Sequence, residues 1–254
     1  MSIATEIQRL QTAKADIKTA IEEKGVEVGN GLIDTYAEKI KEITGGGGDV
    51  IDFARYAKTI TFASLNIFGK SEVVLNLDSA TQLNMLFRIT TAAESANKNT
   101  TVEHLTINCP NLITQTAYML SVNYSVKDEM LKRVTLNVDT SKCTNFNCAF
   151  EYCVALEIID GFPLDFSSAT MATNPLHNCL KLIEFRVVEN SIKISFNAQH
   201  CSNLSAETIQ SIINGLADLT GQTTQTVTFY STVGAKLTDE QKATITAKNW
   251  TLAY

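Results

Sequence analysis

Three cysteines that recur in similar surroundings constrain the fold of this chain more than any other sequence feature. Cys153, Cys179 and Cys201 each have a leucine three residues later, and bulky apolar residues precede each of them. Successive cysteines lie about 26 and about 22 residues apart, a period typical of folds whose repeats stack on one another. We therefore expect one short strand per unit and a column of small buried cysteine side chains.

This pattern resembles the BspA-type leucine-rich repeat, whose units read roughly Ala-Phe-x-x-Cys-x-x-Leu-x-x-Ile. Residues 149–159 follow it most closely. The resemblance implies a β-rich α+β fold, a leucine-rich repeat (BspA-like) solenoid, that binds a ligand rather than catalysing a reaction. A Greek-key sandwich is the alternative, and the period weighs against it.

Alternating apolar residues predict the strands, and capping residues predict the helices near the end of the chain. Asn76, Asn108 and Asn137 fall at the same place in their strands, where they either bond the following turn or lie exposed. Ser205 is expected to cap one helix, and Thr238 begins a capping box before another, which leads to a last strand at 250–254. The other predicted strands are 73–77, 104–108, 133–137, 156–158, 183–187 and 226–230.

The N-terminal residues 1–44 are predicted to form a helical hairpin, joined by a Gly-rich linker at 45–49 to the repeat domain at 50–254. One helix carries an apolar stripe that a hairpin of this size does not bury. We expect the stripe to mediate homo-oligomerisation or docking to another protein, with packing onto the repeat domain as the alternative. The stripe consists of Ile3, Ile7, Leu10, Ile17 and Ile21.

The wording of residues 2–48 resembles the N-terminal segment of tail- and baseplate-associated proteins of phages and prophages of gut bacteria. That resemblance implies attachment to phage tail or baseplate proteins, and a location in the virion tail or, before assembly, in the host cytoplasm. The start of the chain lacks the features of a secretory signal, which favours this hypothesis. The alternative is a bacterial BspA-like adhesion or interaction protein that reaches the cell surface by a non-Sec route.

Composition argues against several classes of function. A net charge of −6 without a basic cluster argues against nucleic-acid binding, and no apolar run approaches the roughly 20 residues that span a membrane. The six cysteines form no Cys-x-x-Cys pair, although His177 and His200 lie near Cys179 and Cys201, so we expect no metal and no cofactor. Without a catalytic motif, we predict no catalytic residues and no enzyme.

The ligand, a protein or a glycan, is expected to contact the solvent side of the strand ladder. Alternation along the predicted strands identifies these outward positions. The alternative is that they are ordinary soluble sheet positions. The predicted surface consists of His104, Thr106, Arg133, Thr135, Glu157, Glu184, Arg186, Thr228 and Tyr230.

Overall fold

The computed structural model describes residues 11–12, 14–15, 17–19, 49–51, 62, 65, 69–77 and 80–254. The chain divides into two compact units, Met1–Asp49 and Val50–Tyr254. In the first unit, the described residues between 11 and 19 are helical. The remainder of the predicted hairpin, including its second helix, and the four linker glycines lie outside the described residues.

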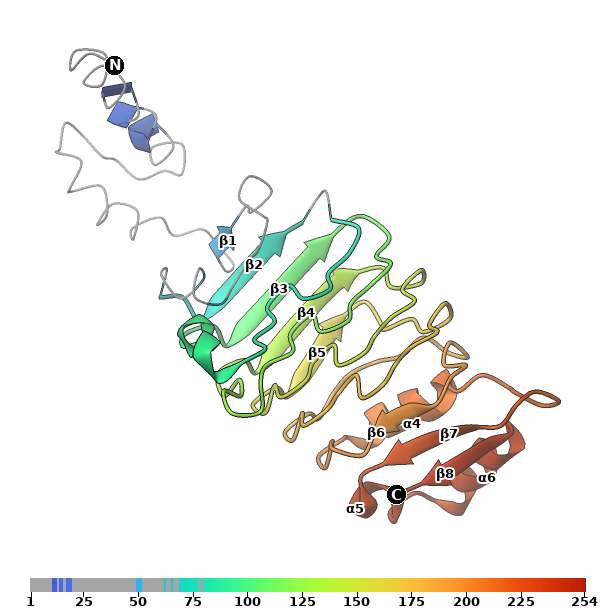
Figure 1. Cartoon of the computed structure of the whole chain (residues 1–254). Helices are drawn as coiled ribbons and strands as arrows, with labels where there is room; N and C mark the ends of the chain where they lie inside the picture. Colours follow the sequence, from blue (N-terminus) through green and yellow to red (C-terminus); the bar gives the residue numbers. More distant parts are fainter. Residues whose placement is uncertain are drawn as a thin grey trace. The chain divides into compact units, whose positions relative to one another are not determined.

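The first sheet contains five strands in the order β1-β2-β3-β4-β5, and β2 to β5 pair in parallel (Figure 1). Leu105 lies opposite Val134 in the register, and both are buried, while the residues beside them on each strand face outward. Alternation therefore directs one side of the sheet into the core. The strands are β1 (Asp49–Ile51), β2 (Glu72–Asn76), β3 (His104–Cys109), β4 (Arg133–Val138) and β5 (Ile158–Gly161).

The second sheet has the order β6-β7-β8 and is also parallel (Figure 1). Its strands are β6 (Phe196–Ala198), β7 (Gln225–Phe229) and β8 (Trp250–Ala253). The helices of this part of the chain are α4 (Ala206–Gly215), α5 (Ser231–Gly234) and α6 (Asp239–Ala247). A 3-10 helix, η3 (Ala92–Asn97), separates β2 from β3 in the sequence.

The sheets show that the predicted fold class is wrong. A β-rich α+β solenoid with a single strand ladder was expected over residues 50–254. The described residues form two small all-parallel sheets and few helices, which is an α/β-type arrangement. The Greek-key alternative is wrong as well, because that topology is antiparallel. Alternation along a segment predicts a strand but not which strands it pairs with or where the sheet ends.

The first sheet ends where a helix takes the place of a strand. Residues 183–187 were predicted as a strand, but they form only isolated bridges, between Glu184 and Ile158 of β5 and between Val187 and Leu164. On the opposite edge of this segment, hydroxyl groups of α4 accept hydrogen bonds from its backbone amides. In a continued sheet, the carbonyl groups of a further strand would accept these bonds. Thr208 Oγ1 lies 3.3 Å from the amide nitrogen of Phe185, and Ser211 Oγ lies 2.9 Å from that of Val187. The backbone of 183–187 is thus satisfied without extending the sheet.

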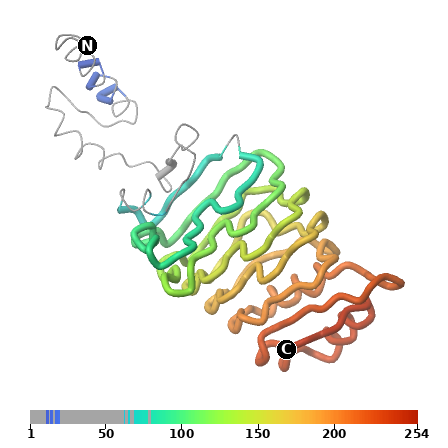
Figure 2. Tube along the Cα trace, in the orientation of Figure 1, coloured from blue at the N-terminus to red at the C-terminus, as the bar shows by residue number. Residues whose placement is uncertain are grey.

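The cysteine column lies in the core, as predicted, and its thiols also form hydrogen bonds. Cys153, Cys179 and Cys201 are fully buried and belong to one hydrophobic cluster. Successive turns of chain lie side by side in this region (Figure 2). Each thiol donates to a backbone carbonyl of the preceding turn: Cys153 to Leu120 at 3.2 Å, Cys179 to Phe150 at 2.9 Å and Cys201 to Leu176 at 3.7 Å.

The predicted capping residues are confirmed. The Ser205 hydroxyl accepts a hydrogen bond from the amide nitrogen of Thr208 at 3.1 Å, so Ser205 is the N-cap of α4. The Thr238 side chain accepts from the backbone of Gln241, whose side chain accepts in turn from the backbone of Thr238, which completes the capping box of α6. The final strand is confirmed as β8, and its Trp250 is buried.

Candidate functional site

The outward face of the first sheet carries charged side chains in register. Glu72, His104 and Arg133 lie opposite one another on three adjacent strands. His104 Nδ1 lies 3.2 Å from Glu72 Oε1, and Arg133 Nε lies 3.1 Å from Asp160 Oδ2 on β5. The Thr135 hydroxyl also donates to Asp160. These contacts join neighbouring strands through their side chains and fix the positions of the charges.

Asparagine side chains form a second row on the same face. Asn108 Nδ2 donates to Asn76 Oδ1 at 2.8 Å, and Asn137 Nδ2 donates to Asn108 Oδ1 at 2.7 Å. The prediction that these residues bond the following turn or lie exposed is therefore wrong, because each one bonds its counterpart in an adjacent strand. Such a ladder forms only between strands that pair in register. The sequence of one strand reveals neither its partner strand nor the register.

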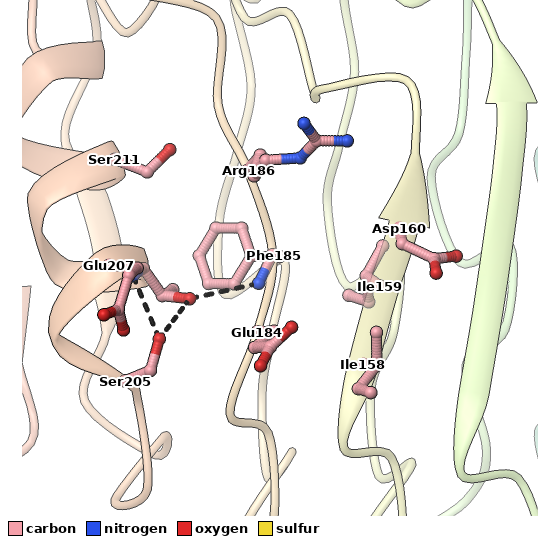
Figure 3. Close-up of a pocket in the computed structure, with 10 residues that line it drawn as sticks. Ile158, Ile159, Asp160, Glu184, Phe185, Arg186, Ser205, Glu207 and Ser211 are labelled. Carbon is pink, nitrogen blue, oxygen red and sulfur yellow. Dashed lines mark hydrogen bonds between the residues drawn. The ribbon is translucent and has the colours of Figure 1, made fainter.

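A groove of about 320 Å³ lies next to this face, where α4 stands beside residues 184–186 (Figure 3). Ser205 and Glu207 lie on the helix side of the groove, and Asp160 lies on the strand side. A helix is about 10 Å wide, whereas paired strands are about 4.8 Å apart. The change from a strand to a helix therefore leaves a hollow at this point of the surface.

Two unpaired carboxylates and a guanidinium group line this groove. Arg186 Nη2 donates to the carbonyl of Gly161 at 3.0 Å, so its position is fixed at the rim. Asp160 is already paired with Arg133. Within the described part of the chain, the Glu184 and Glu207 carboxylates form no hydrogen bond or ion pair with a side chain. They remain available to a ligand that carries hydrogen-bond donors or positive charge.

The structure brings together most of the predicted surface residues but not all of them. His104, Thr106, Arg133 and Thr135 lie on the outward face of β3 and β4. Glu157 directly precedes β5, and Glu184 and Arg186 line the groove. By contrast, Thr228 lies in the second sheet and Tyr230 directly follows its strand β7, so they do not continue this face.

Sequence reasoning did not assign Glu72, Asp160, Glu207 or Ser211 to the site. Ser205, Thr208 and Ser211 recur every three residues, a spacing that places them on one side of a helix. That stripe of hydroxyls was the available signal that α4 lies against a backbone rather than against apolar side chains.

Two histidines lie outside this site and form a separate contact. His177 Nδ1 lies 3.1 Å from Glu151 Oε1, and its ring meets that of His200 edge-on with centroids 4.4 Å apart. Partial burial and the neighbouring His177 lower the pKa of His200. Within the described residues, no group of three or more His, Cys, Asp or Glu side chains is placed to hold a metal ion. The same residues include no helix long and apolar enough to cross a membrane.

Comparisons of the chain with known protein families, with curated proteins and with solved structures find no match. The function must therefore be argued from the chemistry of the site.

Proposed function

We propose that the chain is a non-enzymatic binding protein that contacts a protein or glycan ligand through the outward face of β2 to β5 and the adjoining groove. The groove is the observation that supports this proposal most directly. Its volume of about 320 Å³ falls within the range of about 300–1,000 Å³ usual for ligand sites. It also combines the unpaired carboxylates of Glu184 and Glu207 with the fixed guanidinium group of Arg186.

The state of the thiols supports a binding role rather than nucleophilic catalysis. Burial raises the pKa of Cys201 to about 12, and burial, together with the nearby Glu151, raises that of Cys148 to about 11. Both thiols are therefore protonated at neutral pH. A thiol reacts as a nucleophile through its thiolate, which these surroundings disfavour.

The biological setting that we propose is a phage or prophage tail, with the N-terminal unit as the attachment segment. The wording of residues 2–48 supports this setting, as does the 39% exposure of the apolar Ile17 side chain in a helical stretch. The protein would be assembled in the host cytoplasm and carried in the virion tail.

Binding to bacterial cells tests the proposed face. Fluorescently labelled full-length protein is incubated with a panel of gut bacterial strains, and bound protein is measured by flow cytometry. We expect the double variant Glu184→Ala/Glu207→Ala, and separately Arg186→Ala, to bind at least about ten-fold less, since each removes charged hydrogen-bonding groups. Substitution of Arg133 is avoided because that residue holds Asp160.

The matched control is Lys236→Ala/Glu240→Ala, which removes two exposed charges from the part of the chain that contains α5 and α6. This variant should bind as the unaltered protein does. The free energy of unfolding of every variant should lie within about 0.5 kcal/mol of that of the unaltered protein, as is usual for surface substitutions. Undiminished cell binding by the groove variants would contradict the assignment of this face.

A further inference from the structure

A second groove, of about 390 Å³, lies between residues 170–174 and strands β6 and β7. It does not belong to the outward face of β2 to β5, because β6 and β7 are strands of the other sheet. The segment 170–174 is joined to the preceding turn by an isolated bridge between Asn145 and Met171, not by a strand. The hollow thus forms where an irregular turn is followed by regular strands.

The groove carries no charge. Every residue that lines it in the described chain has a neutral side chain, mainly threonine, asparagine and serine. A phosphate or carboxylate ligand needs donors of positive charge, and a basic ligand needs carboxylates. Neither is present in this lining, so the ligand that it fits is itself neutral.

Several polar groups of the lining are free to bond a ligand. In the described part of the chain, the hydroxyl groups of Thr173, Thr226 and Thr228 make no hydrogen bond to the protein. Asn174 Oδ1 accepts from Asn197 Nδ2 at 2.8 Å, which fixes this amide and leaves its nitrogen as a donor. These groups donate and accept without carrying charge, which complements a ligand rich in hydroxyl groups.

Neighbouring contacts hold the groove in place. Ser195 Oγ donates to Gln225 Oε1 at 2.9 Å and accepts from the amide nitrogen of Thr226 at 3.1 Å. The start of β7 is therefore tied by side chains to the segment before β6. A preformed arrangement of hydrogen-bonding groups reduces the entropy lost when a ligand binds.

An apolar surface accompanies these polar groups. The Met171 side chain is 47% exposed, and Ile194 at the same groove is partly buried. The carbon-bound hydrogens of a sugar ring present an apolar face next to its hydroxyl groups. Met171 and Ile194 can cover such a face while the threonine hydroxyls bond its edge.

We propose that this second groove binds a neutral saccharide. A peptide added as an extra strand is disfavoured, because β7 already pairs with β6 on one side and β8 on the other. Recognition at this place must therefore come from side chains. Uncharged hydroxyl and amide groups beside a small apolar surface fit sugar hydroxyls better than a peptide backbone. The proposal is independent of the charged groove and of the tail-associated setting.

Saturation-transfer difference NMR on the full chain tests this proposal. The probes are neutral oligosaccharides of glucose, galactose, mannose and N-acetylglucosamine, with sialyllactose as an acidic probe and a neutral Gly-Ser peptide. We expect a neutral saccharide to bind, and the double variant Thr226→Val/Thr228→Val to bind it at least about ten-fold more weakly, because two hydroxyl partners are lost. Valine suits a strand, so the fold should persist.

The matched control is Thr251→Val, at the position of β8 that pairs with Thr226 but does not line the groove. This control should bind the saccharide normally, and the charged-groove variant Glu184→Ala/Glu207→Ala distinguishes binding at the second groove from binding at the first. The proposal is overturned if no neutral saccharide binds, if the peptide or sialyllactose binds instead, or if the threonine double variant binds undiminished. Loss of saccharide binding in the charged-groove variant would move the site to the first groove, which also overturns the proposal.

Discussion

At Gly161 the backbone of β5 approaches β4 so closely that a side chain would have no space. The residue has a φ of 88°, and a Cβ placed on it would overlap the carbonyl group of Leu136. That carbonyl also accepts from the amide nitrogen of Phe162 at 2.8 Å, so it is not free to move away. The end of β5, and with it the carbonyl that Arg186 bonds, depends on glycine at this position.

The Gly161→Ala variant should therefore be strongly destabilised, by about 2–4 kcal/mol, because backbone strain and steric overlap both act. Gly221→Ala is the matched control. Gly221 has a φ of 77° but no atom within 4 Å of the added carbon, so that variant should lose only the strain energy, about 1–2 kcal/mol. Urea denaturation measures both values, and equal losses would show that the contact with Leu136 is unimportant.

A buried carboxylate links stability to pH at Asp128. This residue is 1% exposed and accepts from Asn99 Nδ2 and from the amide nitrogens of Met130 and Leu131. Burial raises its pKa, although these hydrogen bonds act in the opposite direction. A carboxyl group whose pKa is raised by folding stabilises the protein below its unfolded pKa, about 3.9, and loses that contribution as pH rises through the folded pKa.

The stability of the unaltered protein relative to Asp128→Asn should thus fall as pH rises above about 4. Asp139→Asn should show the opposite slope, because the backbone and side chain of Ser141 lower the pKa of the exposed Asp139. Its contribution is present at higher pH and is lost as pH falls. Denaturant unfolding at several pH values measures the stability of the unaltered protein relative to each variant. If both stability differences changed with pH in the same direction, the role given to Asp128 would be contradicted.

At the scale of elements, helix α4 is held at its C-terminal end by a lysine from beyond α6. The last carbonyl groups of a helix have no partner within it. Lys248 Nζ donates to the carbonyl groups of Ile213, Asn214 and Leu216, at 3.2, 3.3 and 2.6 Å. This contact joins α4, which borders the charged groove, to the last part of the chain.

Lys248→Met should lower the free energy of unfolding by about 1.5–3 kcal/mol, because charged hydrogen bonds to carbonyl groups are lost while most of the apolar stem remains. Lys242→Met, within α6 itself, is the control and should change stability by less than about 0.5 kcal/mol. Thermal and urea unfolding compare the two. Equal stabilities would mean that α4 does not depend on Lys248.

The same elements show what the sequence could and could not predict. Strands near 73–77, 104–108 and 133–137 and the caps at Ser205 and Thr238 were predicted correctly, because alternation and capping are local signals. The segment 183–187 has the same alternation but lies beside a helix. Whether a segment pairs as a strand depends on whether the segment that packs beside it forms a strand or a helix. Hence Glu184 and Arg186 were predicted as surface residues, whereas the groove that contains them was not.

At the scale of the whole chain, the described apolar core and the predicted attachment segment belong to different units. Among the described residues of unit Val50–Tyr254, a large apolar cluster extends from Phe62 to Trp250. In the other unit, Ile17 lies in a helical stretch with 39% of its surface exposed. Ile17 belongs to the predicted apolar stripe with Ile3, Ile7 and Leu10, which we propose contacts a partner.

We therefore expect the full chain to self-associate or to bind a tail component through residues 1–44, and residues 49–254 to remain monomeric. Sedimentation velocity over a range of concentrations compares the two proteins. In the full chain, Ile17→Glu should weaken association at least about ten-fold, because a charge would be buried in an apolar contact. Thr19→Glu adds the same charge at an exposed helical position and should have little effect. If both chain lengths are monomeric and no tail protein is retained by the full chain, residues 1–44 do not serve as an attachment segment.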